Sequence, residues 1–259
     1  MINLNYVFKI LLISILFSTY SQALKITNLS QAVNISGKQR MFTQRMLKDY
    51  AMVGMGNTFS KPKDDLKNII TSFENNSNEL ESFTKDKATK SSLKQMKEIW
   101  SPIKEELNKT PSTKSAKKLQ ENLENLLKKA DDTTKLFAKQ TGKDSGEIIN
   151  ISGRQRMLSQ KMASLYLLKV WGIDDPNFKE KMKNSMELFK TSLNKLIKYE
   201  KNTSKTSTLL KKVKSSFMFF EIMNKSKSKF IPSLIYKKSD DILKNMDTVT
   251  GIYAKNENN

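Results

Sequence analysis

The chain has 259 residues, of which 46 are lysine or arginine and 26 are aspartate or glutamate, so its formal net charge is +20. It contains no cysteine and no histidine. This composition excludes disulfides, thiolate nucleophiles, histidine bases and zinc sites built on those residues. No other acid-base or nucleophile arrangement is visible, so we expect no catalytic residue, no metal, no cofactor and no enzymatic activity.

The first predicted element is a secretory signal peptide over residues 1–23. An apolar run from Ile10 to Phe17 is followed by Ser21-Gln22-Ala23, which suits a signal peptidase. The run is shorter than the roughly 20 apolar residues of a membrane span, and no later segment is apolar enough. We therefore predict a soluble periplasmic protein with no transmembrane segment in the mature chain. An uncleaved N-terminal anchor is the alternative.

From Leu24 onward the hydrophobic pattern is helical almost throughout, and no stretch alternates long enough to indicate a sheet. Breaks at glycine and proline divide the chain into eight predicted helices: 27–55, 62–84, 87–108, 112–140, 145–171, 176–202, 205–229 and 232–256. Four prolines are predicted at helix starts, where the missing N–H costs nothing: Pro62, Pro111, Pro176 and Pro232. Pro102 is predicted to kink the third helix.

An internal repeat divides these helices into two sets of four. A thirteen-residue segment at 34–46 recurs at 150–162, 116 residues later, with nine identical positions. The same offset aligns Asp131 with Asp247 near the end of each set. The sequence therefore predicts an all-α fold of two tandem up-down four-helix bundles, in repeats 24–143 and 144–259.

The turn at 141–145 decides how the two bundles meet. Four helices return the chain to the end where it began, so a short turn can place the second bundle beside the first, with the motif helices parallel. The bundles would then pack as a pseudo-dimer, with Arg40 facing Arg156 across a pseudo-twofold axis. The alternative fuses the fourth and fifth helices into one and stacks the bundles end to end. Gly142 and Gly146 argue against that continuous helix.

Arginine is confined to the two motif copies, at four positions: Arg40, Arg45, Arg154 and Arg156. Only Arg40 and Arg156 are arginine in both copies, which points to a use for the planar five-donor guanidinium. On a helix, Ser36 and Gly37 share a face with Arg40, and Ser152 and Gly153 repeat that face with Arg156. Small residues let two helices approach closely, so the pattern favours a small anion site between the motif helices.

The origin of the negative charge stays open at this point. Two guanidinium groups in a partly dry interface repel each other, so an anion must lie beside them. It is either a ligand or a carboxylate from another helix, because the motif itself contains no acidic residue. Ser36 and Ser152 have no base and are not nucleophiles. The motif methionines are interpreted as bundle packing.

The two motif segments resemble the first-helix signature of the PilJ-type domain, the N-terminal sensory domain of type IV pili methyl-accepting chemotaxis transducers. They are also similar, more distantly, to the periplasmic sensor domain of the nitrate/nitrite sensor kinases NarX and NarQ. There, one arginine from each of two paired helices holds a nitrate. The resemblance implies a ligand site whose residues are Arg40, Arg156, Gly37, Gly153, Met41 and Met157, and Ser36 and Ser152 complete the predicted set.

Together these observations predict a periplasmic sensory or solute-binding protein. It would bind nitrate or nitrite between the two arginine-bearing helices and signal to a membrane-bound sensor kinase or chemoreceptor. A ligand-free helical interaction or adaptor protein of the cell envelope is the first alternative, and a basic envelope-binding protein acting through its lysines is the second. We expect no nucleic-acid partner, because the lysines are dispersed without interleaved aromatic residues.

Overall fold

The computed structural model of the protein describes residues 26–142, 144–225 and 231–256. The predicted signal peptide, residues 1–23, lies outside the described residues. Within them the chain is helical, with no strand. None of the described helices is long and apolar enough to cross a membrane.

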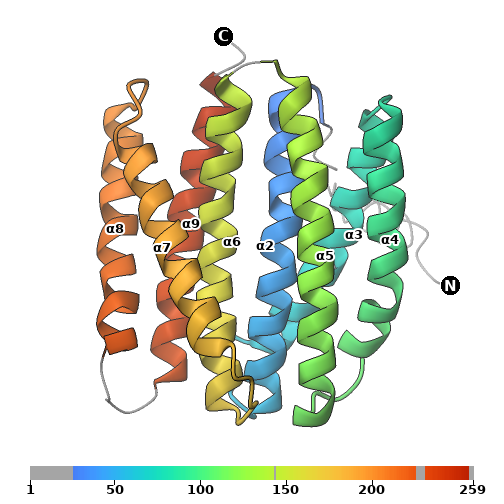
Figure 1. The fold of residues 1–259 in the computed structure, drawn as a ribbon, viewed down its shortest axis with the longest axis vertical. Helices are drawn as coiled ribbons and strands as arrows, with labels where there is room; N and C mark the ends of the chain where they lie inside the picture. The colour runs from blue at the N-terminus through green and yellow to red at the C-terminus, as the bar shows by residue number, and fades with distance from the viewer. Residues whose placement is uncertain (1–25, 143, 226–230, 257–259) are drawn as a thin grey trace, which may run out of the picture.

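Eight helices form the described part of the chain, and they carry the labels of Figure 1. They are α2 (Leu29–Gly54), α3 (Pro62–Phe83), α4 (Lys87–Leu107), α5 (Thr113–Gln140), α6 (Asp144–Val170), α7 (Phe178–Ile197), α8 (Ser204–Lys225) and α9 (Pro232–Asn256). The predicted all-α class is confirmed, and most predicted bounds lie within one or two residues of the observed ones.

The main difference lies at α7. Residues 226–229, the end of the helix predicted over 205–229, lie outside the described residues. The helix predicted to run to residue 202 ends at Ile197, with Lys198 as its C-cap. The side chain of Asn202 donates to the carbonyl of Leu196 (2.7 Å) in the last turn. Pro176 does not open this helix, which starts at Phe178 after Asn177 as its N-cap. The third helix, α4, continues through Pro102 and ends at Leu107.

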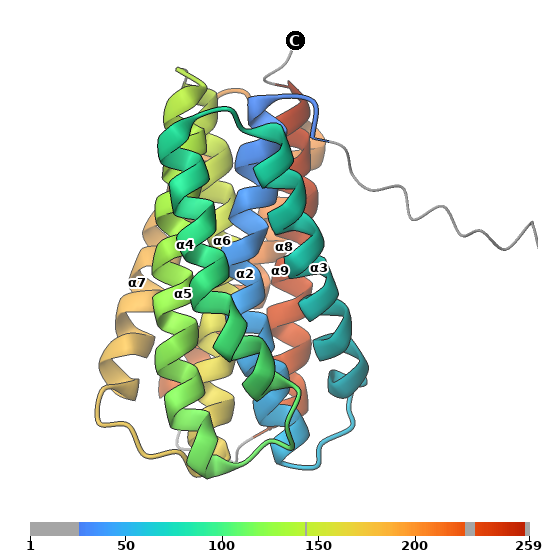
Figure 2. The ribbon, with the colours of Figure 1, turned by 90° about the vertical axis from the view of Figure 1, so that its right-hand side faces the viewer.

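The helices alternate in direction along the chain, and α2 and α6 run parallel through the middle of the molecule (Figure 1). These two helices share the most extensive contact of any pair. Helix α5 packs on α2 and helix α9 packs on α6, so the four form a central group. The helices α3, α4, α7 and α8 lie outside it, as the view turned by 90° also shows (Figure 2).

The turn between α5 and α6 rules out the continuous helix of the end-to-end alternative, which is wrong. Gly142 has a φ of +63°, a left-handed conformation that favours glycine. A Cβ on Gly146 would lie 2.3 Å from Thr141 Oγ1 and 2.7 Å from the Ala138 carbonyl oxygen. The two glycines therefore let the chain reverse tightly and set α6 beside α5.

Helix α2 is buried on almost every side because α3, α5, α6 and α9 all pack against it. The four motif methionines are buried in the common core, as interpreted from the sequence: Met41, Met46, Met157 and Met162. The helical period puts Asp49 on the side of α2 opposite Arg40, and Lys48 between the two. That side is covered as well, and both residues are fully buried.

Candidate functional site

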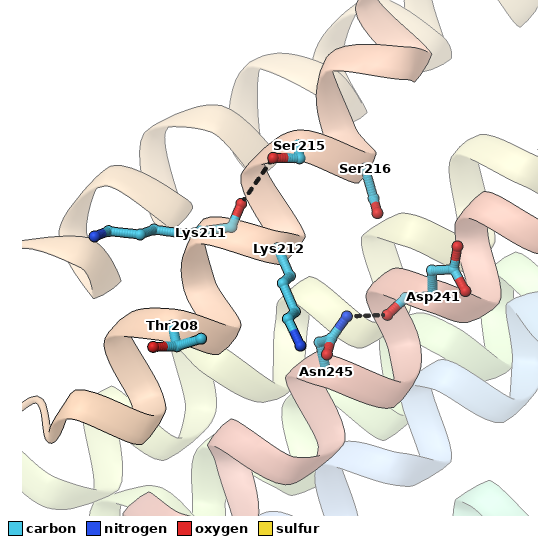
Figure 3. Close-up of a pocket in the computed structure, with 7 residues that line it drawn as sticks. All are labelled: Thr208, Lys211, Lys212, Ser215, Ser216, Asp241 and Asn245. Carbon is cyan, nitrogen blue, oxygen red and sulfur yellow. Dashed lines mark hydrogen bonds between the residues drawn. The ribbon is translucent and has the colours of Figure 1, made fainter.

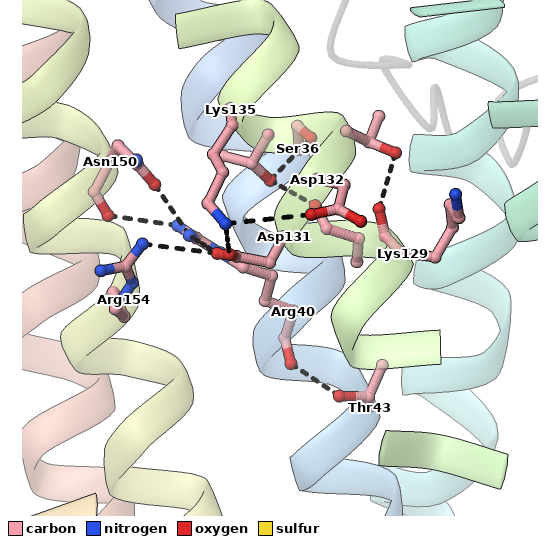
Figure 4. Close-up of polar contacts among 12 residues, drawn as sticks. Ser36, Arg40, Thr43, Lys129, Asp131, Asp132, Lys135, Asn150 and Arg154 are labelled. Atoms are coloured by element: carbon pink, nitrogen blue, oxygen red, sulfur yellow. Dashed lines mark hydrogen bonds and ion pairs between the residues drawn. The ribbon is translucent and has the colours of Figure 1, made fainter. Parts of the chain in front are cut away.

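Arg40 lies fully buried between α2, α5 and α6. Its Nη1 donates to Asp131 Oδ1 on α5 and to Asn150 Oδ1 on α6, each at 2.7 Å. Its Nη2 donates to the backbone carbonyl of Asn150 at 3.1 Å. Figure 4 shows Arg40 held from these two helices at once. The carboxylate that sequence reasoning left open therefore exists, and it comes from the fourth helix of the same repeat.

Arg156 repeats this arrangement with the matching residues, and it is also fully buried. Its Nη1 donates to Asp247 Oδ1 (2.6 Å) on α9 and to Asn34 Oδ1 (2.9 Å) on α2. Its Nη2 donates to the carbonyl of Asn34 at 3.1 Å. Each arginine is thus paired with an aspartate of its own repeat and an asparagine of the other, which is the reciprocity that two matched helices produce.

The two guanidinium groups are close neighbours. A Cβ on Gly37 would lie 3.2 Å from Nη2 of Arg156 and 3.3 Å from Nη2 of Arg40. A Cβ on Gly153 would lie 3.1 Å and 3.3 Å from the same two nitrogens. Both Nη2 groups therefore sit against both glycines, and the absence of side chains at these positions makes room for them.

Each guanidinium keeps two N–H groups that have no acceptor among the described residues. A guanidinium has five N–H donors, and the three bonds described above use both hydrogens of Nη1 and one of Nη2. The Nε of Arg40 and the Nε of Arg156 are buried and have no hydrogen-bond partner. The remaining N–H of Nη2 and the N–H of Nε lie along one edge of the group, the geometry that grips a planar oxyanion through two oxygens.

Asp131 and Asp247 each form ion pairs with more than one cation. Asp131 contacts Arg40 (2.7 Å), Lys135 (2.7 Å) and Arg154 (3.5 Å), as Figure 4 shows. Asp247 contacts Arg156 (2.6 Å) and Lys38 (3.5 Å). The result is a cluster in which cations outnumber carboxylates.

Burial and charge set the pKa values in this cluster. Burial lowers the pKa of Arg40 to about 10, although Asp131 opposes the change. Burial would raise the pKa of Asp131, but the charge of Arg40 and the contacts with Lys135 and Arg154 outweigh it and lower that pKa to about 2. The pKa of Asp247 is also lowered, because Arg156 and Lys38 outweigh burial. Both aspartates are therefore ionised at neutral pH.

The other predicted site residues lie nearby with different partners. Ser36 Oγ and Thr134 Oγ1 share a hydrogen bond of 2.9 Å, and Ser152 Oγ donates to the Ile149 carbonyl at 3.0 Å. Neither serine hydroxyl bonds to a guanidinium. Met41 and Met157 are buried in the core, where they offer apolar packing and no polar contact.

Sequence reasoning missed four residues that hold the arginines: Asn34, Asn150, Asp131 and Asp247. A signal for each was present, because the asparagines open the two motif copies and the aspartates align at the same offset of 116. The repeat alone could not show that each arginine bonds to the asparagine of the other repeat but to the aspartate of its own repeat.

A second buried polar cluster lies further along α2. Lys48 Nζ donates to Asp240 Oδ1 on α9 at 2.6 Å and lies 3.7 Å from the centre of the Tyr236 ring. The Tyr236 hydroxyl donates to Asp49 Oδ1 at 2.7 Å. Burial raises the pKa of Asp49 well above its ordinary value. Because position 165, the match of Asp49, is leucine, this cluster has no copy in the second repeat.

Comparison with known proteins supports one of the resemblances. The family model of PilJ, the N-terminal domain of type IV pili methyl-accepting chemotaxis transducers, matches residues 25–126 and 138–217. The first matched segment begins four residues before α2, and the second begins in the last turn of α5, six residues before α6. No curated protein and no solved structure matches the chain. Since the family model covers more than half of the sequence, the chain belongs to the PilJ family of chemotaxis-transducer sensory domains.

Proposed function

We propose that this protein is a periplasmic sensory protein that binds a small planar oxyanion, nitrate or nitrite, at Arg40 and Arg156. Membership of a sensory family supports the signalling role. The observation that carries the ligand is the pair of buried Nε groups without a hydrogen-bond partner. Buried donors normally have acceptors, and these lie on two adjacent guanidiniums.

The charge of the cluster favours an anion as well. Five cations lie within 4 Å of the two aspartates: Lys38, Arg40, Lys135, Arg154 and Arg156. Lys135 also lies 3.8 Å from Asp132, so five cations face three carboxylates. Arg40 and Arg156 are the fully buried members, and a buried charge attracts an anion more strongly because water screens it weakly. The proposed ligand residues are Arg40 and Arg156, with Gly37, Gly153, Met41 and Met157 around them and Ser36 and Ser152 adjacent.

A bound anion would use the free N–H groups of Nε and Nη2, whereas the aspartates accept from Nη1. Its negative charge would repel Asp131 on α5 and Asp247 on α9, and weakening either ion pair changes how that helix is held against its motif helix. A ligand shifts a conformation only through different affinities for two states, and this repulsion supplies such a difference. We propose that the two repeats respond together as a pseudo-dimer and report to a membrane-bound sensor kinase or chemoreceptor.

One observation favours a second candidate, a ligand-free helical adaptor of the cell envelope. Each arginine already has a carboxylate within 2.7 Å, so the buried charge is compensated without a ligand. In that case the arginines stabilise the contact between repeats, and function resides on the outer surface.

Calorimetric titration with nitrate, nitrite, sulfate and chloride tests the proposal, with Arg40→Lys and Arg156→Lys as variants. Lysine keeps the charge but lacks the planar fork. We expect one nitrate or nitrite per chain, weaker binding of sulfate and chloride, and roughly tenfold or greater loss of affinity in either variant.

Lys90→Gln, a change of one exposed lysine on α4, is the control and should leave the affinity unchanged. Circular dichroism checks that the variants stay helical. If the wild-type protein binds none of the four anions, the oxyanion proposal fails and the adaptor function takes its place.

A further inference from the structure

The outer surface of α8 exposes large apolar side chains near its C-terminal end. Ile222 is 61% exposed and Met218 is 51% exposed, the two highest values for large hydrophobic residues in the described part of the chain. Phe219 and Met223, one position further along, are partly buried. An apolar surface of this kind on a helix indicates contact with another apolar phase.

The matched helix of the first repeat shows that the fold does not need these side chains. Helices α4 and α8 align at an offset of 117, since buried Thr89, Leu93 and Trp100 correspond to buried Thr206, Leu210 and Phe217. At the positions of Met218, Phe219, Ile222 and Met223, α4 has Ser101, Pro102, Glu105 and Glu106. One copy of the same helix is polar outside and the other is apolar, so the apolar residues serve something other than folding.

A polar hollow lies directly beside this surface, between α8 and α9. Its volume is about 500 Å³, and Figure 3 shows Lys212 reaching toward Asn245 across it. The lining residues are Thr208, Lys211, Lys212, Ser215, Ser216, Asp241 and Asn245. In Figure 3 Lys212 points toward α9 and Lys211 points away from it, so one cation lies in the hollow and a second lies at its rim. With one carboxylate, Asp241, in the lining, this part of α8 suits an anionic group.

The lysines of this hollow differ from those of its counterpart between α4 and α5. There, Lys129 Nζ donates to Gln95 Oε1 at 2.7 Å and Lys135 pairs with Asp131 at 2.7 Å. Within the described residues no hydrogen bond or ion pair holds the ammonium of Lys211 or Lys212. These two cations are therefore available to a partner.

The hollow and the apolar residues share one face of α8. Met218 follows Lys211 by seven residues and Ile222 follows Ser215 by seven, which is about two helical turns and returns to the same side. Along this face, cations and hydroxyls at one end give way to apolar side chains at the other. Anionic phospholipid has the same order, with phosphate beside acyl chains.

We propose that the protein docks on an anionic phospholipid surface through this face of α8, defined by Lys211, Lys212, Met218 and Ile222. The lysines would bind lipid phosphate while Met218 and Ile222 enter the interfacial region. A second copy of the chain fits less well, because it would bring the same lysines and a net charge of +20. A protruding helix surface also needs no complementary groove in a lipid layer.

Sedimentation of the full chain with vesicles tests this inference, using phosphatidylglycerol with phosphatidylcholine against phosphatidylcholine alone. We expect binding only to the anionic vesicles. The double variant Met218→Ser/Ile222→Glu introduces residue types that α4 carries at Ser101 and Glu105, outside the core. This variant should bind the anionic vesicles at least roughly tenfold more weakly than wild type. The variant Lys211→Gln/Lys212→Gln should also bind them more weakly than wild type.

The matched control is Lys90→Gln/Lys94→Gln, which removes two exposed lysines from α4 and should change binding less than twofold. Residues 1–25 are common to all variants and so do not affect the comparison. The inference is overturned if the wild type does not bind, if the apolar variant binds like wild type, or if both lysine pairs weaken binding equally. Absent vesicle binding, with dimerisation abolished by the apolar variant, would identify a second copy as the partner.

Discussion

Arg40 grips Asn150 through two hydrogen bonds, one to the side-chain oxygen at 2.7 Å and one to the backbone carbonyl at 3.1 Å, although 110 residues separate them. Asparagine precedes arginine by six positions in both motif copies. A long side chain on a helix points back toward the N-terminus of that helix. On a parallel neighbour in register, it therefore reaches the level of the asparagine, and this explains why the grip is reciprocal.

Because the two contacts are reciprocal, replacing Asn34 or Asn150 should lower the free energy of unfolding by similar amounts. Asn150→Ala and Asn34→Ala each remove a side-chain acceptor from a buried guanidinium and leave the backbone carbonyl in place. Hydrogen bonds to charged groups contribute about 1.5–3 kcal/mol, so each variant should lose a similar amount of unfolding free energy in urea. The exposed Asn75→Ala is the control, expected within about 0.5 kcal/mol of wild type. Clearly unequal losses would show that the two arginine sites are not equivalent.

Replacing glycine by alanine should change the free energy of unfolding in opposite directions at Gly37 and at Gly251. A Cβ at Gly37 would lie within 3.3 Å of Nη2 of both Arg40 and Arg156. The hydrogen bonds of these guanidinium groups hold them in place, so they cannot easily move away. Gly37→Ala should therefore lower the unfolding free energy by about 1–3 kcal/mol. Gly251, inside α9, has nothing within 4 Å of the new Cβ, so Gly251→Ala should raise it by about 0.5–1 kcal/mol. A stabilised Gly37→Ala variant would contradict the close approach at this position.

Asp131 predicts a loss of stability in acid. Its pKa is lowered from 3.8 to about 2 in the folded protein. The stabilisation linked to its charge is therefore complete above the unfolded pKa and lost as pH falls through the folded pKa. Urea unfolding at pH 2, 3, 4 and 7 should show Asp131→Asn less stable than wild type at pH 7, with a smaller difference at pH 2. An unchanged difference across this range would show that Asp131 is not held as an ion.

Asp49 should affect stability in the opposite direction to Asp131 as pH changes. Its carboxyl is fully buried, Oδ2 accepts no hydrogen bond, and burial, together with Asp65, outweighs Lys48 and raises its pKa. The folded state holds a proton that the unfolded state releases above about pH 4, so this group costs stability as pH rises toward the folded pKa. Asp49→Asn removes that cost and should gain stability over wild type from pH 5 to pH 8.

Unfolding of wild type and Asp49→Asn at pH 5, 6.5 and 8 checks this expectation. The exposed Asp174→Asn, which leaves the buried cluster intact, should follow wild type at each pH. If the advantage of Asp49→Asn over wild type does not grow with pH, Asp49 is ionised in the folded protein.

Local patterns were enough to predict the helices, the repeat and the arginine face. Helix bounds depend on neighbouring residues, as at Asn28, whose side chain accepts from the Gln31 N–H at 2.9 Å, and at Pro62, which opens α3. The helical period places Arg40 beside Gly37 whatever surrounds them. The end of α7 was missed because Asn202, whose side chain donates to a carbonyl of the last turn, lies beyond that turn in the sequence.

The tertiary structure decided which groups meet the arginines. Asp131 and Asp247 align with each other in the sequence, but only the packing of α5 on α2 and of α9 on α6 brings them to Arg40 and Arg156. The burial of Asp49 likewise depends on α9 covering the far side of α2. Side-chain partners across helices follow from chain packing over long separations, whereas the period, the breaks and the internal repeat are properties of the sequence itself.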